Sequence, residues 1–256
     1  AAKELLTDAT GAVIGVLVET PDGLKRVRGR QAVIVATGGY AHNTDMIQRY
    51  QEVFAYGSCA MPSSQGDFIP LASRVGAQMG NLHGAWRCGV VLEQALENRS
   101  VGTGLFVPPG DSILLVNRFG QRFVNEHRNY NDRSRSHATF DPNRVEFPNE
   151  FQFMVYDQRI VETVGEQNGQ PPIKPAESYV ISGQTLSDLA QNIAARVEAL
   201  APRLGGYELD KSFAQNLKDT VQSFNQYAVK GCGPAQSGGL FQYDDRRPAS
   251  GSGRGG

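Results

Sequence analysis

The sequence predicts an α/β unit followed by an α+β unit. An uninterrupted apolar run at residues 32–35 breaks into small residues and glycines, as a buried strand does where it ends in a loop. From about residue 91 the pattern changes to paired and short alternating strands, followed by two amphipathic helices. We therefore divide the chain into residues 1–90, residues 91–245 and a polar, glycine-rich tail, residues 246–256, which we expect to be disordered.

The first elements are strands. Residues 12–18 and 24–28 predict a hairpin, because Pro21-Asp22-Gly23 between them is a turn sequence. Residues 32–36 predict a third, buried strand. A short helix is expected from the N-cap Asn43 to Tyr50, and a second over residues 67–78. Pro70 is tolerated in its first turn, where backbone amides have no helical partner.

The second part begins with short strands. Residues 113–117 and 122–125 predict a strand pair, and residues 150–156 and 179–182 predict single strands. Thr185 and Asp188 form the sequence of a capping box before a helix with an apolar face. Asp210 predicts the N-cap of a last helix, which we expect to end at Gly231.

Composition excludes several classes of protein. The net charge of −1 gives no basic field for nucleic acid, and no apolar run is long enough to span a membrane. The 3 cysteines, Cys59, Cys88 and Cys232, show no zinc spacing, and no metal site is predicted. An odd number of separated cysteines favours reduced thiols and a cytoplasmic location.

The glycines after residues 32–35 suggest a nucleotide-binding site. In open α/β sheets nucleotides bind where strands end, next to a glycine turn that holds the phosphates. The GxGxxG spacing occurs at Gly251, Gly253 and Gly256, in the tail, with no strand before it and no helix after it. We reject it as a fingerprint, since that site needs both elements. An ordinary strand-to-loop transition remains the alternative for residues 36–39.

Several segments carry a resemblance to a known family. They are VIVATGGYAHN, QGDFIPLASRVGAQM, ILLVNRFGQRFVNE, FQFMVYDQR and LKDTVQSFNQYAVKG, in that order along the chain. Together they resemble the FAD-dependent fumarate reductase/3-ketosteroid dehydrogenase flavoproteins, with the 3-ketosteroid dehydrogenase branch the most similar.

The resemblance implies a fold and a cofactor. Residues 1–90 would be part of a split Rossmann-like FAD domain, and residues 91–245 an inserted α+β catalytic, or capping, domain. In that family the pyrophosphate turn precedes this region and a flavin-clasping segment follows it. The chain thus resembles the middle portion of such a protein, and we expect it to lack both terminal FAD-binding segments.

The resemblance also implies the residues that meet FAD. Ala36, Thr37, Gly38 and Gly39 would lie along the cofactor, and Asn43, Gly66 and Asp67 would approach its ribityl or flavin part. Glycines admit the cofactor, and a helix start offers amides to its polar groups. Asp67 would bind a hydroxyl group, and its alternative role is capping the second helix.

Tyr130, with Glu126 and Arg128, is the implied catalytic group. In ketosteroid dehydrogenases a tyrosine at this spacing removes the substrate proton next to a ketone while a hydride passes to flavin N5. A tyrosine acts as a base near neutral pH only if its phenolate is stabilised. The positive charge of Arg128 or Arg133 is suited to stabilise it. Glu126 would orient these groups or relay a proton. Its alternative role is a salt bridge with Arg122.

Other charged residues do not determine the class of substrate. Arg133, Arg135 and Arg144 join Arg128 in a basic cluster that is either solvated or holds an anionic substrate. The histidines show no metal spacing. Trp86 is interpreted as a core residue or as part of a cavity wall.

Two enzyme reactions remain. The first is FAD-dependent dehydrogenation of a CH–CH bond in a steroid-like ketone. The second is reduction of an unsaturated carboxylate, as in fumarate reductase. The fumarate reductase branch carries a His-Pro pair that this sequence lacks, and Arg159, the nearest match to its proton-donating arginine, stands two residues early. Both features argue against the second reaction. Either reaction needs a small-molecule substrate and an external electron acceptor or donor. The third alternative is a truncated chain without activity.

Overall fold

The computed structural model describes residues 1–108, 110–166 and 170–230. The chain divides into two units, residues 1–104 and residues 105–256. The dividing point falls after the helix α3 (Leu92–Glu97), later than the boundary at residue 90 predicted from the sequence. The predictions for the tail, for Gly231 and for the GxGxxG spacing concern residues outside the described ranges.

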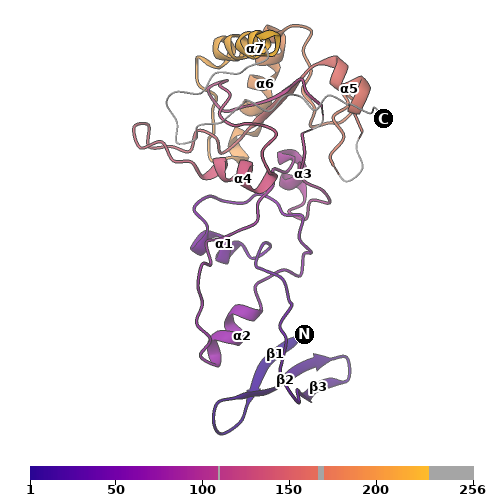
Figure 1. The fold of residues 1–256 in the computed structure, drawn as a ribbon, viewed down its shortest axis with the longest axis vertical. Helices are drawn as coiled ribbons and strands as arrows, with labels where there is room; N and C mark the ends of the chain where they lie inside the picture. The colour runs from indigo at the N-terminus through magenta and orange to yellow at the C-terminus, as the bar shows by residue number, and fades with distance from the viewer. Residues whose placement is uncertain (109, 167–169, 231–256) are drawn as a thin grey trace, which may run out of the picture. The chain divides into compact units, whose positions relative to one another are not determined.

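The first unit begins with a three-stranded antiparallel sheet in the order β1-β2-β3 (Figure 1). Its strands are β1 (Ala2–Thr7), β2 (Val13–Thr20) and β3 (Gly23–Arg28). The predicted hairpin is confirmed, with Thr20 opposite Gly23 at the turn. β1 was not predicted, because its lysine and glutamate interrupt the alternation of apolar side chains.

The strand predicted at residues 32–36 is wrong. Among the described residues no strand pairs with this segment, and Ile34 is 90% exposed. A strand is defined by hydrogen bonds to a neighbour, and the apolar run carries no information about where that neighbour lies.

Three short helices complete the first unit. They are α1 (Thr44–Tyr50), α2 (Phe68–Arg74) and α3 (Leu92–Glu97). The helix from Asn43 to Tyr50 is confirmed. The second predicted helix exists but ends at Arg74, where Gly76 takes a positive φ of 81° and stops it.

The second unit contains a two-stranded antiparallel sheet of β4 (Ile113–Val116) and β5 (Phe153–Tyr156). The strand predicted at residues 122–125 is wrong, and only a single bridge joins Val116 to Arg122. The physical reason is a side chain. Leu115 N, which would pair with that strand, donates instead to Glu126 Oε1 at 2.9 Å. The strand predicted at residues 179–182 is also wrong, because Val180 N closes a turn on Glu177 O.

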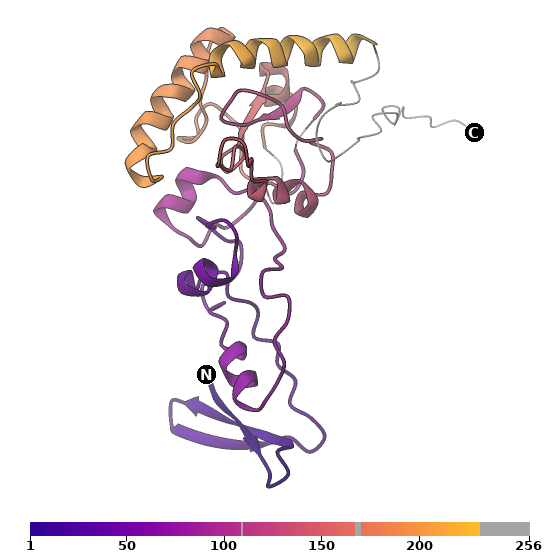
Figure 2. The same cartoon turned by 90° about the vertical axis from the view of Figure 1, so that its left-hand side faces the viewer.

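Helices supply most of the regular secondary structure of the second unit. They are α4 (Tyr130–Ser134), η1 (Arg135–Ala138), α5 (Gln158–Val164), α6 (Leu186–Leu200), η2 (Ala201–Arg203) and α7 (Phe213–Lys230). In Figure 2, α7 is seen lengthwise beside α6. The capping box of Thr185 and Asp188 is confirmed. Asp210 accepts from Ser212 N at 2.9 Å, and the helix begins just after it at Phe213.

The core of the second unit lies between the sheet and the two long helices. Its buried members are Leu114, Val116, Val155, Ala190, Ile193, Val197, Phe213 and Leu217. The turn after β4 is fixed against α7, since Asn216 Nδ2 donates to Phe119 O at 2.9 Å and Thr220 Oγ1 to Gly120 O at 2.8 Å. Gly120 has a φ of +73°, and a Cβ there would lie 2.4 Å from Phe213 O. Only glycine fits this contact.

Candidate functional site

The glycine segment of the first unit presents its backbone to the outside. Residues 34–39 are exposed, and Gly38 has a φ of +75°. In the part of the chain that the structure describes, the amides of Ala36, Thr37, Gly38 and Gly39 donate no hydrogen bond. A Cβ on Gly39 would meet no atom within 4 Å. Four consecutive amides are therefore accessible as donors to a polar ligand.

A second glycine holds this segment in place. Gly66 N donates to Gly39 O at 2.9 Å, which brings the glycine segment to the start of α2. Gly66 has a φ of +80°, and a Cβ there would lie 2.6 Å from Met46 Sδ and 2.8 Å from Tyr40 Cβ. Packing alone thus requires glycine at this position, whatever the site binds.

Asn43 and Asp67 stand at the starts of the two helices in different ways. Asn43 Oδ1 accepts from Met46 N at 3.1 Å, and its Nδ2 donates to Gln65 O at 2.9 Å. Asn43 is therefore used in holding the loop before Gly66. Asp67 is exposed and makes no side-chain capping bond, so the capping role considered for it is wrong.

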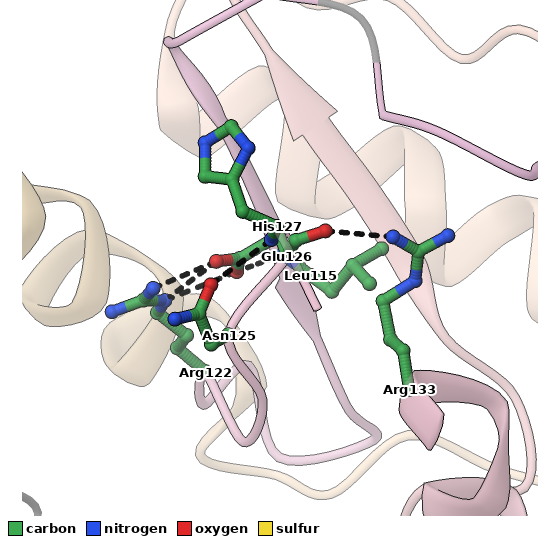
Figure 3. Close-up of polar contacts among 6 residues, drawn as sticks. All are labelled: Leu115, Arg122, Asn125, Glu126, His127 and Arg133. Atoms are coloured by element: carbon green, nitrogen blue, oxygen red, sulfur yellow. Dashed lines mark hydrogen bonds and ion pairs between the residues drawn. The ribbon is translucent and has the colours of Figure 1, made fainter. Parts of the chain in front are cut away.

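Glu126 lies at the centre of the candidate site in the second unit (Figure 3). Its side chain is 3% exposed and forms a salt bridge with Arg122, Oε2 to Nη2, at 2.7 Å. Arg122 Nε adds bonds of 3.0 and 3.1 Å to the two carboxylate oxygens. With the bond from Leu115 N, the carboxylate is held by β4 on one side and by an arginine on the other. A buried carboxylate needs such partners to remain charged.

A second arginine reaches the same residue through its backbone. Arg133, 4% exposed, donates from Nη1 to Glu126 O at 2.6 Å and from Nη2 to Leu105 O at 2.9 Å. Figure 3 shows Arg122 and Arg133 on opposite sides of Glu126. Arg133 thus fastens α4 to the segments at residues 105 and 126. Sequence reasoning considered it as a stabiliser of the Tyr130 phenolate and as part of a solvated or anion-binding cluster. It missed this structural role, because no local pattern marks which carbonyl groups an arginine will reach.

Tyr130 begins the helix that Arg133 fastens. Asn129 caps that helix, accepting from Asn131 N at 2.9 Å. The ring of Tyr130 meets Phe106 edge-on, with the ring centres 5.1 Å apart. Phe106 was not singled out from the sequence, since nothing in its local context links it to residue 130. The tyrosine is half-buried in a position fixed by the helix and by an aromatic neighbour.

Three tyrosines of the second unit have raised pKa values. Burial raises the pKa of Tyr156 to about 12, and its hydroxyl donates to Ile173 O at 3.0 Å. Burial also raises the pKa of Tyr179 to about 12, and its hydroxyl donates to Pro172 O at 2.7 Å. The pKa of Tyr207 is raised by burial as well. Phenolates are disfavoured at these three positions.

The predicted basic cluster separates into residues with different surroundings. Arg144 lies over the Phe119 ring, 4.2 Å from its centre, and near Asp141. Arg128 and Arg135 are exposed, and Arg128 N donates to Asn125 O at 3.1 Å. Arg133 is buried, as described above. Arg144 is exposed as well, with 54% of its side chain accessible, so of the four arginines Arg133 alone is buried.

The remaining predicted residues have simple surroundings. His42 Nε2 lies 2.9 Å from Ala60 O, and His137 Nδ1 lies 2.7 Å from Glu150 O. Trp86 is 80% exposed, so the core role considered for it is wrong. Within residues 1–108, 110–166 and 170–230, no group of three or more histidine, cysteine or acidic side chains is arranged to hold a metal.

The chain is similar to a known family and to several characterised enzymes. Residues 1–251 match the family described as FAD binding domain. The 4-oxocyclohexanecarboxylate 2-dehydrogenase of Sinomonas cyclohexanicum is 30% identical over 239 residues, 93% of this chain and 38% of that protein. A fumarate reductase (cytochrome) of Shewanella frigidimarina is 33% identical over 128 residues, 48% of this chain and 21% of that protein. The chain spans less than half the length of either relative.

A solved structure shows the same fold. The 3-ketosteroid delta1-dehydrogenase from Sterolibacterium denitrificans, in complex with 1,4-androstadiene-3,17-dione, superposes with a TM-score of 0.64 and 23% identity. The match covers 90% of this chain and 39% of that one. The mixed α/β class predicted from the sequence is confirmed. No helix of the described residues is long and apolar enough to cross a membrane.

Proposed function

The chain belongs to the FAD binding domain family, and on this basis we propose that the protein is an FAD-dependent oxidoreductase that dehydrogenates a CH–CH bond beside a ketone. The family predicted from the sequence is confirmed, and it indicates FAD as the cofactor. The observation that carries the proposed reaction is the 30% identity, over 93% of this chain, to a dehydrogenase of a ring ketone.

The glycine segment has the properties that FAD binding needs. The exposed amides of Ala36–Gly39 are available to the polar groups of the cofactor, and the open space at Gly39 lets a large ligand approach the backbone. Asp67, whose carboxylate is not used for capping, would accept a hydrogen bond from a ribityl or ribose hydroxyl. When bound, FAD supplies the acceptor for the hydride.

Residues 1–104 would then contribute to a split Rossmann-like FAD domain, and residues 105–230 would form the catalytic, or capping, domain. The described sheets are antiparallel, so support for the Rossmann-like part comes from the family match rather than from strand order. We also propose that the reduced cofactor passes its electrons to an external acceptor and that the protein is cytoplasmic.

Tyr130 would hold the proton that leaves the substrate. Its helix start and the Phe106 contact fix the ring, and the residue is only partly buried. Arg128, two residues earlier and exposed, would favour the phenolate by its charge. The Tyr130 phenolate would take the proton from the substrate carbon and become a neutral phenol.

Glu126 would act as a positioning residue rather than as a proton relay. Its carboxylate is engaged by Arg122 and Leu115, and its carbonyl by Arg133. The same contacts that bury it fix the segment leading to Tyr130. Glu126 would thus form the salt bridge with Arg122 and also support the reaction, without contacting the substrate.

The test compares Tyr130→Phe with Tyr227→Phe in the protein expressed from its intact gene. Dye-coupled oxidation of 4-oxocyclohexanecarboxylate and of a 3-ketosteroid is measured, together with the yellow flavin that co-purifies. Loss of a general base lowers the rate by about 10²–10⁴-fold. We expect this for Tyr130→Phe with bound flavin unchanged, and no change for Tyr227→Phe on α7. Full activity in Tyr130→Phe would remove tyrosine from the mechanism.

A second candidate is reduction of an unsaturated carboxylate, favoured by the 33% identity to the fumarate reductase segment and by the exposed Arg128 and Arg135. Arginine pairs with carboxylates in two-point geometry. Oxidation of a reduced dye by fumarate discriminates the two reactions. Turnover with fumarate and none with either ketone would replace the first proposal by this one. Absence of both flavin and turnover would support the inactive chain.

A further inference from the structure

Two cysteines of the first unit lie side by side although 29 residues separate them. Cys59 Sγ and Cys88 Sγ are 4.0 Å apart, and both are thiols in the structure. A disulfide needs about 2.05 Å between the sulfurs. The two sulfurs must therefore approach each other by about 2 Å to form the bond.

The surroundings hold the sulfurs together. A Cβ on Gly104 would lie 2.5 Å from Cys88 Sγ and 3.2 Å from Cys59 Sγ, so both sulfurs rest on a position without a side chain. The backbone beside Cys59 is paired, since Ser58 N donates to Arg99 O at 2.8 Å and Val101 N to Ser58 O at 3.0 Å. Cys59 is exposed and Cys88 is half-buried, so a soluble oxidant reaches the first of them.

We propose that Cys59 and Cys88 form a reversible dithiol/disulfide pair oxidised by a small disulfide such as glutathione disulfide. The Cys59 thiolate attacks one sulfur of glutathione disulfide, and one glutathione thiolate leaves with the bonding electron pair. The Cys88 thiolate then attacks Cys59 Sγ, and the second glutathione leaves. Two protein thiols are oxidised, one glutathione disulfide is reduced to two thiols, and the two protein protons pass to the released glutathione.

The bond would close a loop that contains Gly66, Asp67 and all of α2. Neither the pairing nor its chemistry depends on the proposed enzymatic reaction. The third cysteine, Cys232, lies outside the described residues and is treated as a competitor in the test.

The experiment incubates the protein with glutathione disulfide and counts reactive thiols under denaturing conditions. Tryptic digestion places the 3 cysteines in separate peptides, residues 50–74, 88–99 and 231–246. In a Cys232→Ser background we expect the count to fall to zero, with peptides 50–74 and 88–99 joined and no glutathione retained. Dithiothreitol should restore both thiols.

Single variants test the order of attack. In the same background, Cys88→Ser should retain glutathione on Cys59, because the second thiol that resolves the mixed disulfide is missing. Cys59→Ser should retain it on Cys88 more slowly. Stable glutathione adducts on both residues of the Cys232→Ser protein, two unreacted thiols, or a disulfide between molecules would each overturn the proposal.

Discussion

The two units differ in what surrounds their apolar side chains. In residues 1–104, Ile34, Met61 and Trp86 are among the most exposed large apolar side chains of the described chain. In residues 105–230 the residues of β4 are all buried. Leu114 and Val116 pack with residues of α6 and α7, and Ile113 packs with Ile160 of α5. The segment assigned to cofactor binding thus lies in the unit with little core of its own, whereas the proposed base lies in the unit with a defined core.

The difference shows which signals in a sequence are local. The periodic apolar faces of α6 and α7 specify both the helix and the side to be buried, and both helices were predicted. The apolar run at residues 32–35 indicates only that its side chains should be buried, and not which element buries them. Whether such a run becomes a strand depends on a partner that the run does not encode.

The largest expected difference between the units comes from truncating apolar side chains. Leu217 is fully buried against the sheet and the turn at Gly120, so Leu217→Ala should lower the free energy of unfolding by about 4 kcal/mol. Ile34→Ala in the first unit should change it by less than about 0.5 kcal/mol. Urea unfolding followed by far-ultraviolet circular dichroism measures both. Equal losses would mean that the segment around Ile34 is covered in solution.

A smaller contrast is expected from ion pairs. Glu126→Gln leaves Arg122 without its buried partner and should lower the free energy of unfolding by about 3 kcal/mol. The matched change in the first unit is Glu19→Gln, whose pair with Lys3 is exposed on both sides. It should leave the urea midpoint of unfolding close to that of the unchanged protein, because exposed pairs contribute little to stability.

The same pair of variants separates position from chemistry at Glu126. If Glu126 only positions the segment before Tyr130, activity of Glu126→Gln should recover at low temperature as folding recovers. An inactive variant with wild-type unfolding behaviour would instead identify the carboxylate as a catalytic group.

The smallest contrast is at the helix starts. Thr185→Ala removes the capping box of α6 and should lower the free energy of unfolding by about 1 kcal/mol. Asp67→Ala removes no capping bond and should leave it within about 0.5 kcal/mol. The thermal unfolding midpoint reports each change. A loss at Asp67 as large as that at Thr185 would show that its carboxylate has a partner in solution.

Much of the helical structure and the family followed from sequence, whereas the contacts of the site did not. Asn43 was predicted as a cap because its signal lies within one turn of helix. The strand expected at residues 122–125 failed because Glu126 takes the Leu115 amide that the strand would have used. Arg133 was expected either in a solvated or anion-binding cluster or beside Tyr130, but it is buried and binds carbonyl groups at residues 105 and 126. Such long-range pairings depend on the completed fold.

The contact between the Gly120 turn and α7 has a consequence for biosynthesis. The hydrogen bonds of Asn216 and Thr220 reach back 97 and 100 residues to Phe119 and Gly120. Contacts between residues so distant along the chain form late, since the intervening chain must be ordered first. During translation, β4 and its turn leave the ribosome long before α7 does. The nascent chain therefore exposes the apolar strand until α7 emerges, and in that interval it is open to chaperones and to aggregation.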